Sequence, residues 1–510
     1  MKNNRSVNAF RNMVAGFAMK ITQILLPFLT RTVMIHVLGM EYLGLSGLFA
    51  SILDMLNMVE LGVGRAMVFS MYKPIAENRE DTLCALMRLY KVYYRIIGLV
   101  VAIGGMLILP FIPRLIKGDV PADVSVYALY LLNLAATVLS YWLFAYKNSI
   151  LSAHQREDIV SRVKLIIVVV QNGVQMLLLF LTHNYYTFVI TVLVMQVITN
   201  ITTAVIANRM YPQYVAKGKL PKAEVQKINA QIKDLFTSKI GGVVFSAADS
   251  VVISAFLGLQ ILGIYQNYYY IVNAIIGFVQ IIYSATTAGI GNSIITETKE
   301  KNYRDFSKLT FFIAWIAGFC SCCFICLFQP FMELWVGKKG LLPMGMVLLL
   351  GVFFWIWELY RLINVYKDAA GIWHEDRFRP LIAAGVNLGL NITLVNICGL
   401  YGVILSTVLS VLFVGWPWAM HNVFSNLFAK AYIIGYVAKL INYALVSTVA
   451  IAITYTICGL VKGNLFFIVA VRACICVAVT NGLFWLAYCR TAEYMEMKQL
   501  VQSLLKKRRR

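Results

Sequence analysis

LGMEYLG at residues 38–44 returns as LGLQILG at residues 257–263, a shift of 219 residues. Each copy joins two long apolar runs. Leucine and glycine are common in an apolar chain, so this match needs a second one at the same spacing before it indicates an internal repeat.

A second match supplies that spacing. Tyr146-Lys147, followed by His154, returns as Tyr366-Lys367, followed by His374, a shift of 220 residues. Both matches fall at the same place in the order of apolar runs. The sequence therefore predicts two related halves.

The composition places these halves in a membrane. Of the 510 residues, 60% are hydrophobic and only 13% are charged, and the mean hydropathy is +0.74. Soluble proteins carry roughly 45–50% apolar and about 25% charged residues. The composition excludes a soluble enzyme, a disordered scaffold and a secreted disulfide domain, and it leaves a polytopic membrane protein.

The apolar runs are about 20 residues long, which as helix is enough to cross roughly 30 Å of hydrocarbon. They do not alternate with period two, so we expect helices and not barrel strands. The predicted fold is all-α with about fourteen transmembrane helices, near residues 13–37, 43–70, 92–113, 124–147, 164–182, 185–208, 238–257, 262–291, 309–331, 341–366, 380–398, 401–420, 432–458 and 464–488.

The net charge of +22 comes from basic residues in the gaps between these runs. Alternate gaps are rich in Lys and Arg, and the cations of the other gaps are Arg114, Lys117, Lys338, Lys339 and Lys462. By the positive-inside rule both termini are cytoplasmic. Topology explains the charge, so we expect membrane lipids and no nucleic acid as partners.

These features define a domain organisation. We expect an N-lobe of spans 1–6 (1–208), a basic cytoplasmic linker (209–237), a C-lobe of spans 7–12 (238–420), a further pair of spans (432–488) and a basic tail (489–510). Six spans is an even number, so the halves are parallel repeats, as in many transporters. We expect a cavity between two such lobes and alternating access; the alternative is a duplicated bundle without transport.

Polar residues inside the spans are candidate site residues. A charge at bilayer depth costs at least ~2.5–3.5 kcal/mol on insertion scales and usually faces a pathway. Such residues occur in spans 1, 2, 7 and 8, and in span 8 they form one stripe at helical spacing. The candidates are Arg31, Asp54, Asn57, Glu60, Arg65, Asp249, Gln266, Asn273 and Gln280.

Each candidate also has a structural alternative. Arg31 and Asp249 would form a buried ion pair, in which each charge compensates the cost of removing the other from water. Arg65 would reach the cytoplasmic headgroups by snorkelling. Glu358 and Arg361, three residues apart in span 10, are better explained as a local pair than as a substrate site.

Other motifs favour neither a metal nor a catalytic function. Cys320, Cys322, Cys323 and Cys326 lie inside an apolar span, where thiols usually pack as small apolar side chains, so no metal site is predicted. No GxxxxGK[ST] motif occurs, which excludes ATP hydrolysis through a P-loop. The predicted outer loops are short, which argues against a membrane enzyme of glycan assembly. We expect no enzyme and no cofactor.

The chain resembles the polysaccharide flippases of the multidrug/oligosaccharidyl-lipid/polysaccharide (MOP) exporter superfamily. The segments that carry the resemblance are GMEYLGL (39–45), ELGVG (60–64), GIYQNY (263–268), NLGLN (387–391) and GLYG (399–402). The resemblance implies two lobes in a V around a cationic cavity, in a bacterial cytoplasmic membrane. It also implies export of a polyprenyl-diphosphate-linked oligosaccharide to the outer leaflet, with polysaccharide polymerase and glycosyltransferases as functional partners.

The resemblance also implies roles for the candidates. Arg31 and Arg65 would bind the diphosphate, because arginine makes paired, charge-assisted hydrogen bonds to phosphate. Asn57, Gln266, Asn273 and Gln280 would meet sugar hydroxyls. Asp54, Glu60 and Asp249 would hold a coupling proton or sodium ion. The alternatives are a cation-coupled multidrug antiporter of the same superfamily, in which twelve spans are usual, and a lipid II-type flippase, which shares the two extra spans.

Overall fold

The computed structural model describes the backbone of residues 2–60, 62–118 and 120–499. Side chains are described over the same ranges except at 2–19, 234, 235, 237–239, 246 and 288. Every regular element in these ranges is a helix, so the all-α prediction is confirmed.

Among the described residues, twelve helices are long and apolar enough to cross a membrane, and a bent pair at Val126–Trp142 and Ala145–Ala153 makes a thirteenth. They coincide with thirteen of the fourteen predicted spans. The remaining predicted span, 13–37, falls on the long helix Lys2–Val37, whose side chains up to residue 19 lie outside the described set. The chain is a multi-pass membrane protein.

The chain divides into two compact units, Met1–Gly263 and Ile264–Arg510. The helices of the first unit are α1 (Lys2–Val37), α2 (Met40–Leu56), η1 (Asn57–Glu60), α3 (Val63–Ala76), α4 (Glu80–Ile108), η2 (Leu109–Leu115), α5 (Val126–Trp142), η3 (Ala145–Lys147), α6 (Asn148–Ala153), α7 (Glu157–Thr182), α8 (Tyr185–Met210) and α9 (Lys222–Leu257). Helix α9 therefore begins within the segment predicted as a linker.

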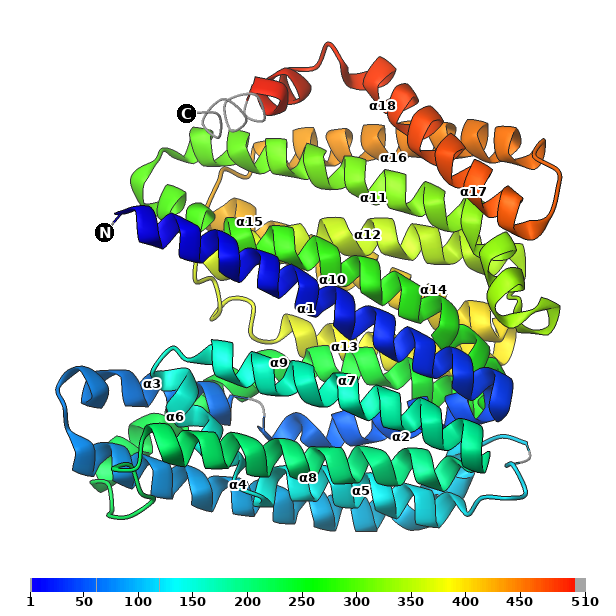
Figure 1. Ribbon diagram of the computed structural model, residues 1–510. Helices are drawn as coiled ribbons and strands as arrows, with labels where there is room; N and C mark the ends of the chain where they lie inside the picture. Colours follow the sequence, from blue (N-terminus) through cyan, green and yellow to red (C-terminus); the bar gives the residue numbers. More distant parts are fainter. Residues whose placement is uncertain (1, 61, 119, 500–510) are drawn as a thin grey trace. The chain divides into compact units, whose positions relative to one another are not determined.

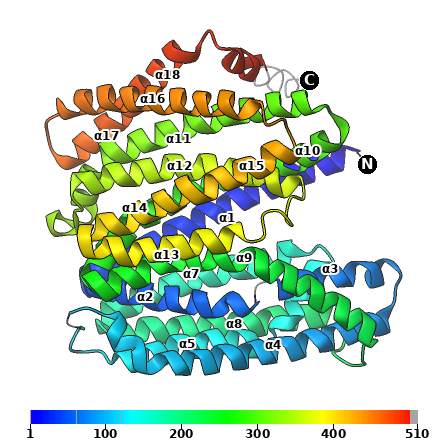
Figure 2. The ribbon, with the colours of Figure 1, turned by 180° about the vertical axis from the view of Figure 1, so that it is seen from behind.

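Within the first unit, α7 packs against α1 and α8, and α5 packs against α4 and α8 (Figures 1 and 2). A buried hydrogen bond ties two of these helices together: Thr30 Oγ1 on α1 donates to Asn172 Oδ1 on α7 at 2.7 Å. Such a bond satisfies polar groups that hydrocarbon would leave unpaired. The result is a helical bundle with polar links in its interior.

The two LG-x3-LG segments pack against each other within the first unit. A Cβ at Gly44 would overlap the carbonyl oxygen of Leu259, and a Cβ at Gly263 would overlap the carbonyl oxygen of Met40. The contact is reciprocal, because Met40 and Gly44 correspond to Leu259 and Gly263 in the repeat. Glycine is required here so that two backbones can approach closely. The repeat seen in the sequence is thus a packing contact in the structure.

The second predicted span is broken. Helix α2 ends at Leu56, η1 follows as one turn of 3₁₀ helix, and α3 begins at Val63. Gly62, between them, has the left-handed backbone angle φ +93°, which glycine adopts without a Cβ clash. Breaks in membrane helices are tolerated where the backbone is buried in protein or lines a cavity. The break therefore marks a place to look for a site.

The second unit contains the remaining helices. They are α10 (Leu259–Thr296, which begins in the first unit), α11 (Lys299–Val336), η4 (Lys338–Gly340), α12 (Met344–Ala369), α13 (Arg379–Cys398), α14 (Leu400–Ser410), η5 (Val411–Gly415), α15 (Trp416–Asn426), α16 (Tyr432–Gly459), α17 (Leu465–Ile475), η6 (Cys476–Thr480) and α18 (Asn481–Tyr488).

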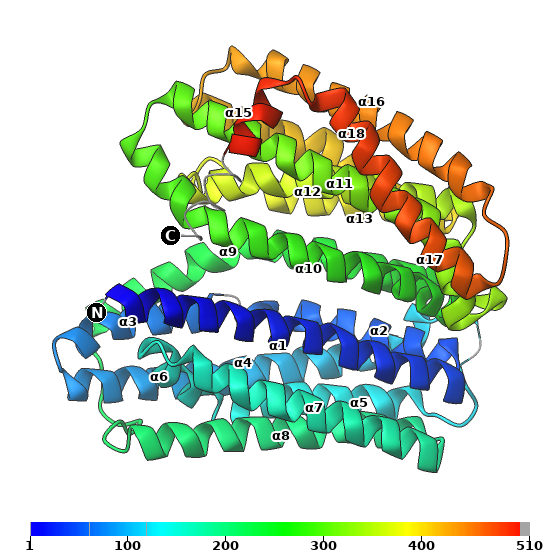
Figure 3. The ribbon, with the colours of Figure 1, turned by 45° about the horizontal axis from the view of Figure 1, so that its top comes forward.

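Helix α11 is central to this unit. It packs against α12, α16 and α17, and Figure 3 shows α16 and α17 beside it. Two of the predicted spans, 401–420 and 464–488, contain a π-helical segment, η5 and η6. Single π turns of this kind occur often at functional sites.

Candidate functional site

The first unit contains a polar cavity of about 1160 Å³. Residues of α1, α3, α4, α5, α6, α7 and α8 line it. Along α7 the lining runs from Glu157 to Gln171, which at helical rise is about 21 Å, more than half of a hydrocarbon core of ~30 Å. The cavity thus reaches deep into the bundle.

The broken second span forms part of the wall. Glu60, at the end of η1, and Arg65, in the first turn of α3, both line the cavity, as do Gly62 and Gly64. An acidic and a basic side chain, one on each side of the break, thus face the same space.

Tyrosines surround Glu60. The hydroxyl of Tyr94 donates to Glu60 Oε1 at 3.0 Å, and the hydroxyl of Tyr90 donates to Tyr94 at 2.7 Å. The hydroxyl of Tyr141 donates to Asn57 Oδ1 at 2.9 Å. These bonds connect η1 to α4 and α5. A carboxylate that accepts a hydrogen bond from a hydroxyl and lines a polar cavity is suited to binding a proton or a small cation.

Amides and hydroxyls line another part of the cavity, beside apolar side chains such as Val68 and Ile167. Gln196 Nε2 donates to Asn200 Oδ1 at 3.3 Å, and Asn200 Nδ2 donates to the carbonyl oxygen of Ser140 at 2.9 Å. Gln23 and Gln171 also face the space. Groups that both donate and accept hydrogen bonds match the hydroxyls of a sugar.

Charges of both signs are present. Arg65 and Lys164 supply two cations to the wall, and Glu60 and Glu157 supply two carboxylates. The wall is therefore not purely cationic, unlike the cavity that the resemblance implies.

The structure brings only some of the candidates together. Glu60 and Arg65 line the cavity. Asn57 lies beside it through Tyr141, whereas Asp54 is an exposed residue near the end of α2. Arg31 and Asp249 are half-buried and do not belong to the lining. Their roles, including the alternative of an Arg31–Asp249 pair, stay predictions.

The remaining candidates lie on α10 in the second unit. Gln266 is half-buried, and Asn273 and Gln280 are exposed. Gln280 accepts a hydrogen bond from Arg361, which also forms an ion pair with Glu358 at 2.9 Å. The local Glu358–Arg361 pair is thus confirmed, and it extends to Gln280. The sugar-binding roles of these three residues stay predictions.

Sequence reasoning missed several wall residues. Lys164 lies at the first residue of the predicted span 164–182, where it belongs to a basic gap by position, and the structure places it on α7 facing the cavity. Tyr90, Tyr94 and Tyr141 carried no signal, because aromatic residues are common in membrane helices. The one sequence signal was the ELGVG segment (60–64), whose two glycines mark the break.

The second unit has a contrasting feature, an apolar groove of about 620 Å³. It is lined by α11, α12, η5, α15 and α16, through side chains such as Ile325, Trp355, Leu412, Leu440 and Ala444. No charged residue is among its lining residues. Such a surface suits a hydrocarbon chain.

Comparison with known proteins identifies the family. Residues 9–288, more than half of the chain, match the family described as "Polysaccharide biosynthesis protein". The chain belongs to this family. A search of curated proteins gave no match. The family match spans the whole polar cavity of the first unit.

Solved structures show the fold. The lipid II flippase MurJ, in an inward closed conformation, is similar over 93% of this chain and 98% of its own length, with a TM-score of 0.67 and 14% identity. An inward-facing multidrug resistance MATE transporter of the MOP superfamily is similar over 78% of this chain and 94% of its own, with a TM-score of 0.60 and 18% identity. This member of the family therefore has a MurJ/MATE-like fold.

Proposed function

We propose that the protein flips a polyprenyl-diphosphate-linked oligosaccharide from the cytoplasmic to the outer leaflet of the cytoplasmic membrane, by alternating access, for cell-surface polysaccharide assembly. The observation that carries the proposal is the polar cavity of the first unit, in a chain that belongs to a polysaccharide biosynthesis family. Its N- and C-termini are cytoplasmic in this proposal, as the basic gaps predict.

The cavity wall supports a glycan headgroup as the substrate. Arg65 and Lys164 would bind the diphosphate, Arg65 by paired hydrogen bonds and Lys164 as a point charge. The amides and hydroxyls around them would form hydrogen bonds with sugar hydroxyls. These bonds would replace those to water, so that transfer of the headgroup into the cavity costs little free energy. The predicted role of Arg31 in diphosphate binding is part of the same proposal.

The lipid part of the substrate needs an apolar surface. The groove of the second unit supplies one without charged residues, and burying an isoprenoid chain there is favourable by about 25 cal/mol per Å² of apolar surface. A substrate with a polar head and a long apolar tail uses both kinds of wall.

Glu60 is the best candidate for coupling to a proton or sodium gradient. It combines a position in the cavity wall with hydrogen bonding to Tyr94. A bound cation would neutralise the carboxylate beside Arg65, and its release would restore the pair of opposite charges. The charge next to the diphosphate would thus change within the transport cycle.

A second function, cation-coupled multidrug export, is favoured by one observation. The cavity carries two carboxylates, Glu60 and Glu157, which would attract a cationic drug. Flipping of a lipid II-type substrate would use the same polar cavity for a different headgroup.

The test is a flipping assay in proteoliposomes with a fluorescent polyprenyl-diphosphate oligosaccharide of short lipid chain. Dithionite added outside quenches the outer-leaflet probe at once, and wild-type protein should make the inner-leaflet probe accessible to it as well. Arg31→Ala and Arg65→Ala should each lower the rate, at unchanged reconstituted amount. Lys73→Ala is the control, because that lysine on α3 is 78% exposed and is not part of the wall.

A deletion strain supplies the second arm. It should accumulate a lipid-linked oligosaccharide detectable by mass spectrometry. If no such intermediate accumulates, and overexpression instead raises drug resistance, the antiporter function replaces the flippase. Undiminished transport by Arg31→Ala would remove that residue from the site.

A further inference from the structure

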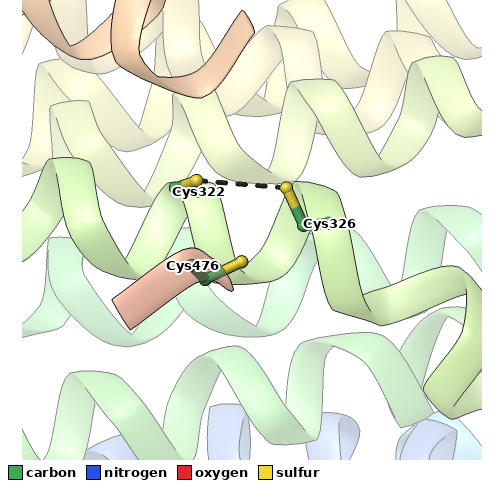
Figure 4. Close-up of side chains that lie close together, drawn as sticks. All are labelled: Cys322, Cys326 and Cys476. Atoms are coloured by element: carbon green, nitrogen blue, oxygen red, sulfur yellow. Dashed lines mark hydrogen bonds between the residues drawn. The ribbon is translucent and has the colours of Figure 1, made fainter. Parts of the chain in front are cut away.

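Three cysteines that are far apart in the sequence meet inside the second unit. Cys322 and Cys326 lie one turn apart on α11, and Cys476 begins the π segment η6 (Figure 4). Their three Sγ atoms all lie within 4.8 Å of one another, and all three residues are buried. A fourth buried cysteine, Cys458 on α16, packs against the group.

The spacing suits a metal ion. The Sγ atoms of Cys322 and Cys326 are 3.9 Å apart. Metal–thiolate bonds are about 2.3 Å long, so two sulfurs on one ion stand about 3.8 Å apart in a tetrahedron and about 4.0 Å apart in a trigonal plane. Small movements of Cys476 would complete such a site.

Buried thiols usually pack as small apolar side chains, and two neighbours distinguish this cluster. Thr480 Oγ1, on the same π segment as Cys476, donates a hydrogen bond to Cys322 Sγ at 3.1 Å. A hydroxyl donor in this position would hold and orient a metal-bound thiolate.

The second neighbour is a cation. Arg472 stands one turn before Cys476, and its Nη1 donates to the carbonyl oxygen of Cys326 at 3.4 Å. Its Nε is buried and has no hydrogen-bond partner among the described residues. Arg472 is half-buried, and metal-bound thiolates would place negative charge near its unused Nε donor.

We propose that Cys322, Cys326 and Cys476 bind one soft d¹⁰ metal ion, with copper(I) as the preferred occupant. Binding breaks three S–H bonds, forms three metal–sulfur bonds and releases three protons, with no change of oxidation state. The trithiolate complex of a monovalent ion carries two negative charges, and Arg472 offsets one of them.

The ligand set selects the ion. Soft thiolate ligands favour Cu(I), zinc and iron–sulfur clusters over hard cations. Structural zinc takes four ligands, and Cys458, the fourth buried cysteine of the cluster, lies outside the group of three whose Sγ atoms are within 4.8 Å of one another. A trigonal site buried among apolar side chains therefore matches Cu(I) best.

A bound ion would also link helix α11 to the α17–η6 helix. Its ligands come from α11 and from the α17–η6 helix, so a bound ion would add a link between helices that already pack together. A ligand that binds only the folded state raises stability by mass action. The inference is independent of the proposed transport activity.

The experiment uses the full-length purified protein, kept reduced and anaerobic, titrated with Cu(I) against the competing chelator bathocuproine disulfonate. We expect one Cu(I) per chain and an apparent unfolding temperature that rises by several degrees. Cys476→Ala and Cys322→Ala should each weaken binding at least about 100-fold and abolish the thermal shift. Cys474→Ala, two residues away and exposed, is the matched control and should bind as wild type.

Three outcomes would overturn the proposal. One is Cu(I) binding that Cys476→Ala leaves unchanged. Another is no binding by wild type that elutes as a single folded species. The third is preferential binding of Zn²⁺ in the same competition. If Cys476→Ala does not fold, the same Cu(I) titration of Cys476→Ser decides the question: weakened binding supports the site, and binding as in wild type refutes it.

Discussion

The two hollows of the molecule differ in the kind of surface that they offer. The cavity of the first unit has four charged residues and many amides and hydroxyls in its wall. The groove of the second unit has no charged residue among its lining residues. Both are built from membrane helices in a chain with an internal repeat. The groove includes α16, which lies outside the predicted repeat, so the two interiors differ in their helices as well as in their side chains.

The difference also shows how each hollow is maintained. In the first unit, hydrogen bonds such as Tyr94 to Glu60 hold the wall in place. In the groove, contacts among apolar side chains such as Trp355 and Leu440 do so. Substitutions that change the polarity of the cavity or of the groove therefore test most directly what each of them does.

The largest effect is expected from Arg65→Glu. It leaves three carboxylates and one cation in the polar cavity, which would repel a diphosphate at close range. We expect the rate of flipping in proteoliposomes to fall more than about 10-fold, since two charge changes of ~1 kcal/mol or more add up. Lys73→Glu, on the same helix and outside the wall, should keep the wild-type rate. Equal losses in both variants would mean that only the net charge of the unit matters.

Filling the apolar groove is the next test. Ala444→Trp places a large ring between α16 and α12 and should lower the rate for a long-chain lipid about fivefold, while a short-chain analogue is affected less. Val449→Trp is the control, because Val449 on the same helix is 58% exposed and lies outside the lining. If chain length makes no difference, the groove does not bind the lipid tail.

A smaller effect is expected on the unfolding temperature when a carboxylate is introduced into the apolar groove or into the polar cavity. Thr448→Asp puts a charge into the groove at bilayer depth, where insertion scales give a cost of about 2.5–3.5 kcal/mol, partly relieved by local water. We expect an unfolding temperature lowered by a few degrees. Ser152→Asp, in the polar cavity, should leave the unfolding temperature nearly unchanged. A reversed order would contradict the difference in polarity.

The smallest effect is expected from Tyr94→Phe. It removes one hydroxyl donor to Glu60, a net loss of about 0.5 kcal/mol, and should lower the rate about twofold. Tyr93→Phe removes a hydroxyl that bonds to Asn229 at an exposed position, and it should have no effect on the rate. If both variants transport like wild type, the carboxylate does not depend on its tyrosines.

Much of the fold could be predicted from the sequence. Apolar runs long enough to span hydrocarbon gave the helices, because lipid leaves the backbone no partner except its own carbonyl oxygens. The repeated glycines were also visible, and Gly44 and Gly263 indeed mark a close backbone contact. These features depend on local composition and spacing, which a sequence states directly.

The site was only partly visible. Glu60 and Arg65 stood out because charges are rare in spans, but Lys164 and the tyrosines of the wall did not. Nor did the sequence bring Cys476 to Cys322 and Cys326, which are some 150 residues away. Which face of each helix borders water, lipid or another helix depends on packing between distant segments. Tertiary structure alone decides that, because the same residue types serve all three surroundings.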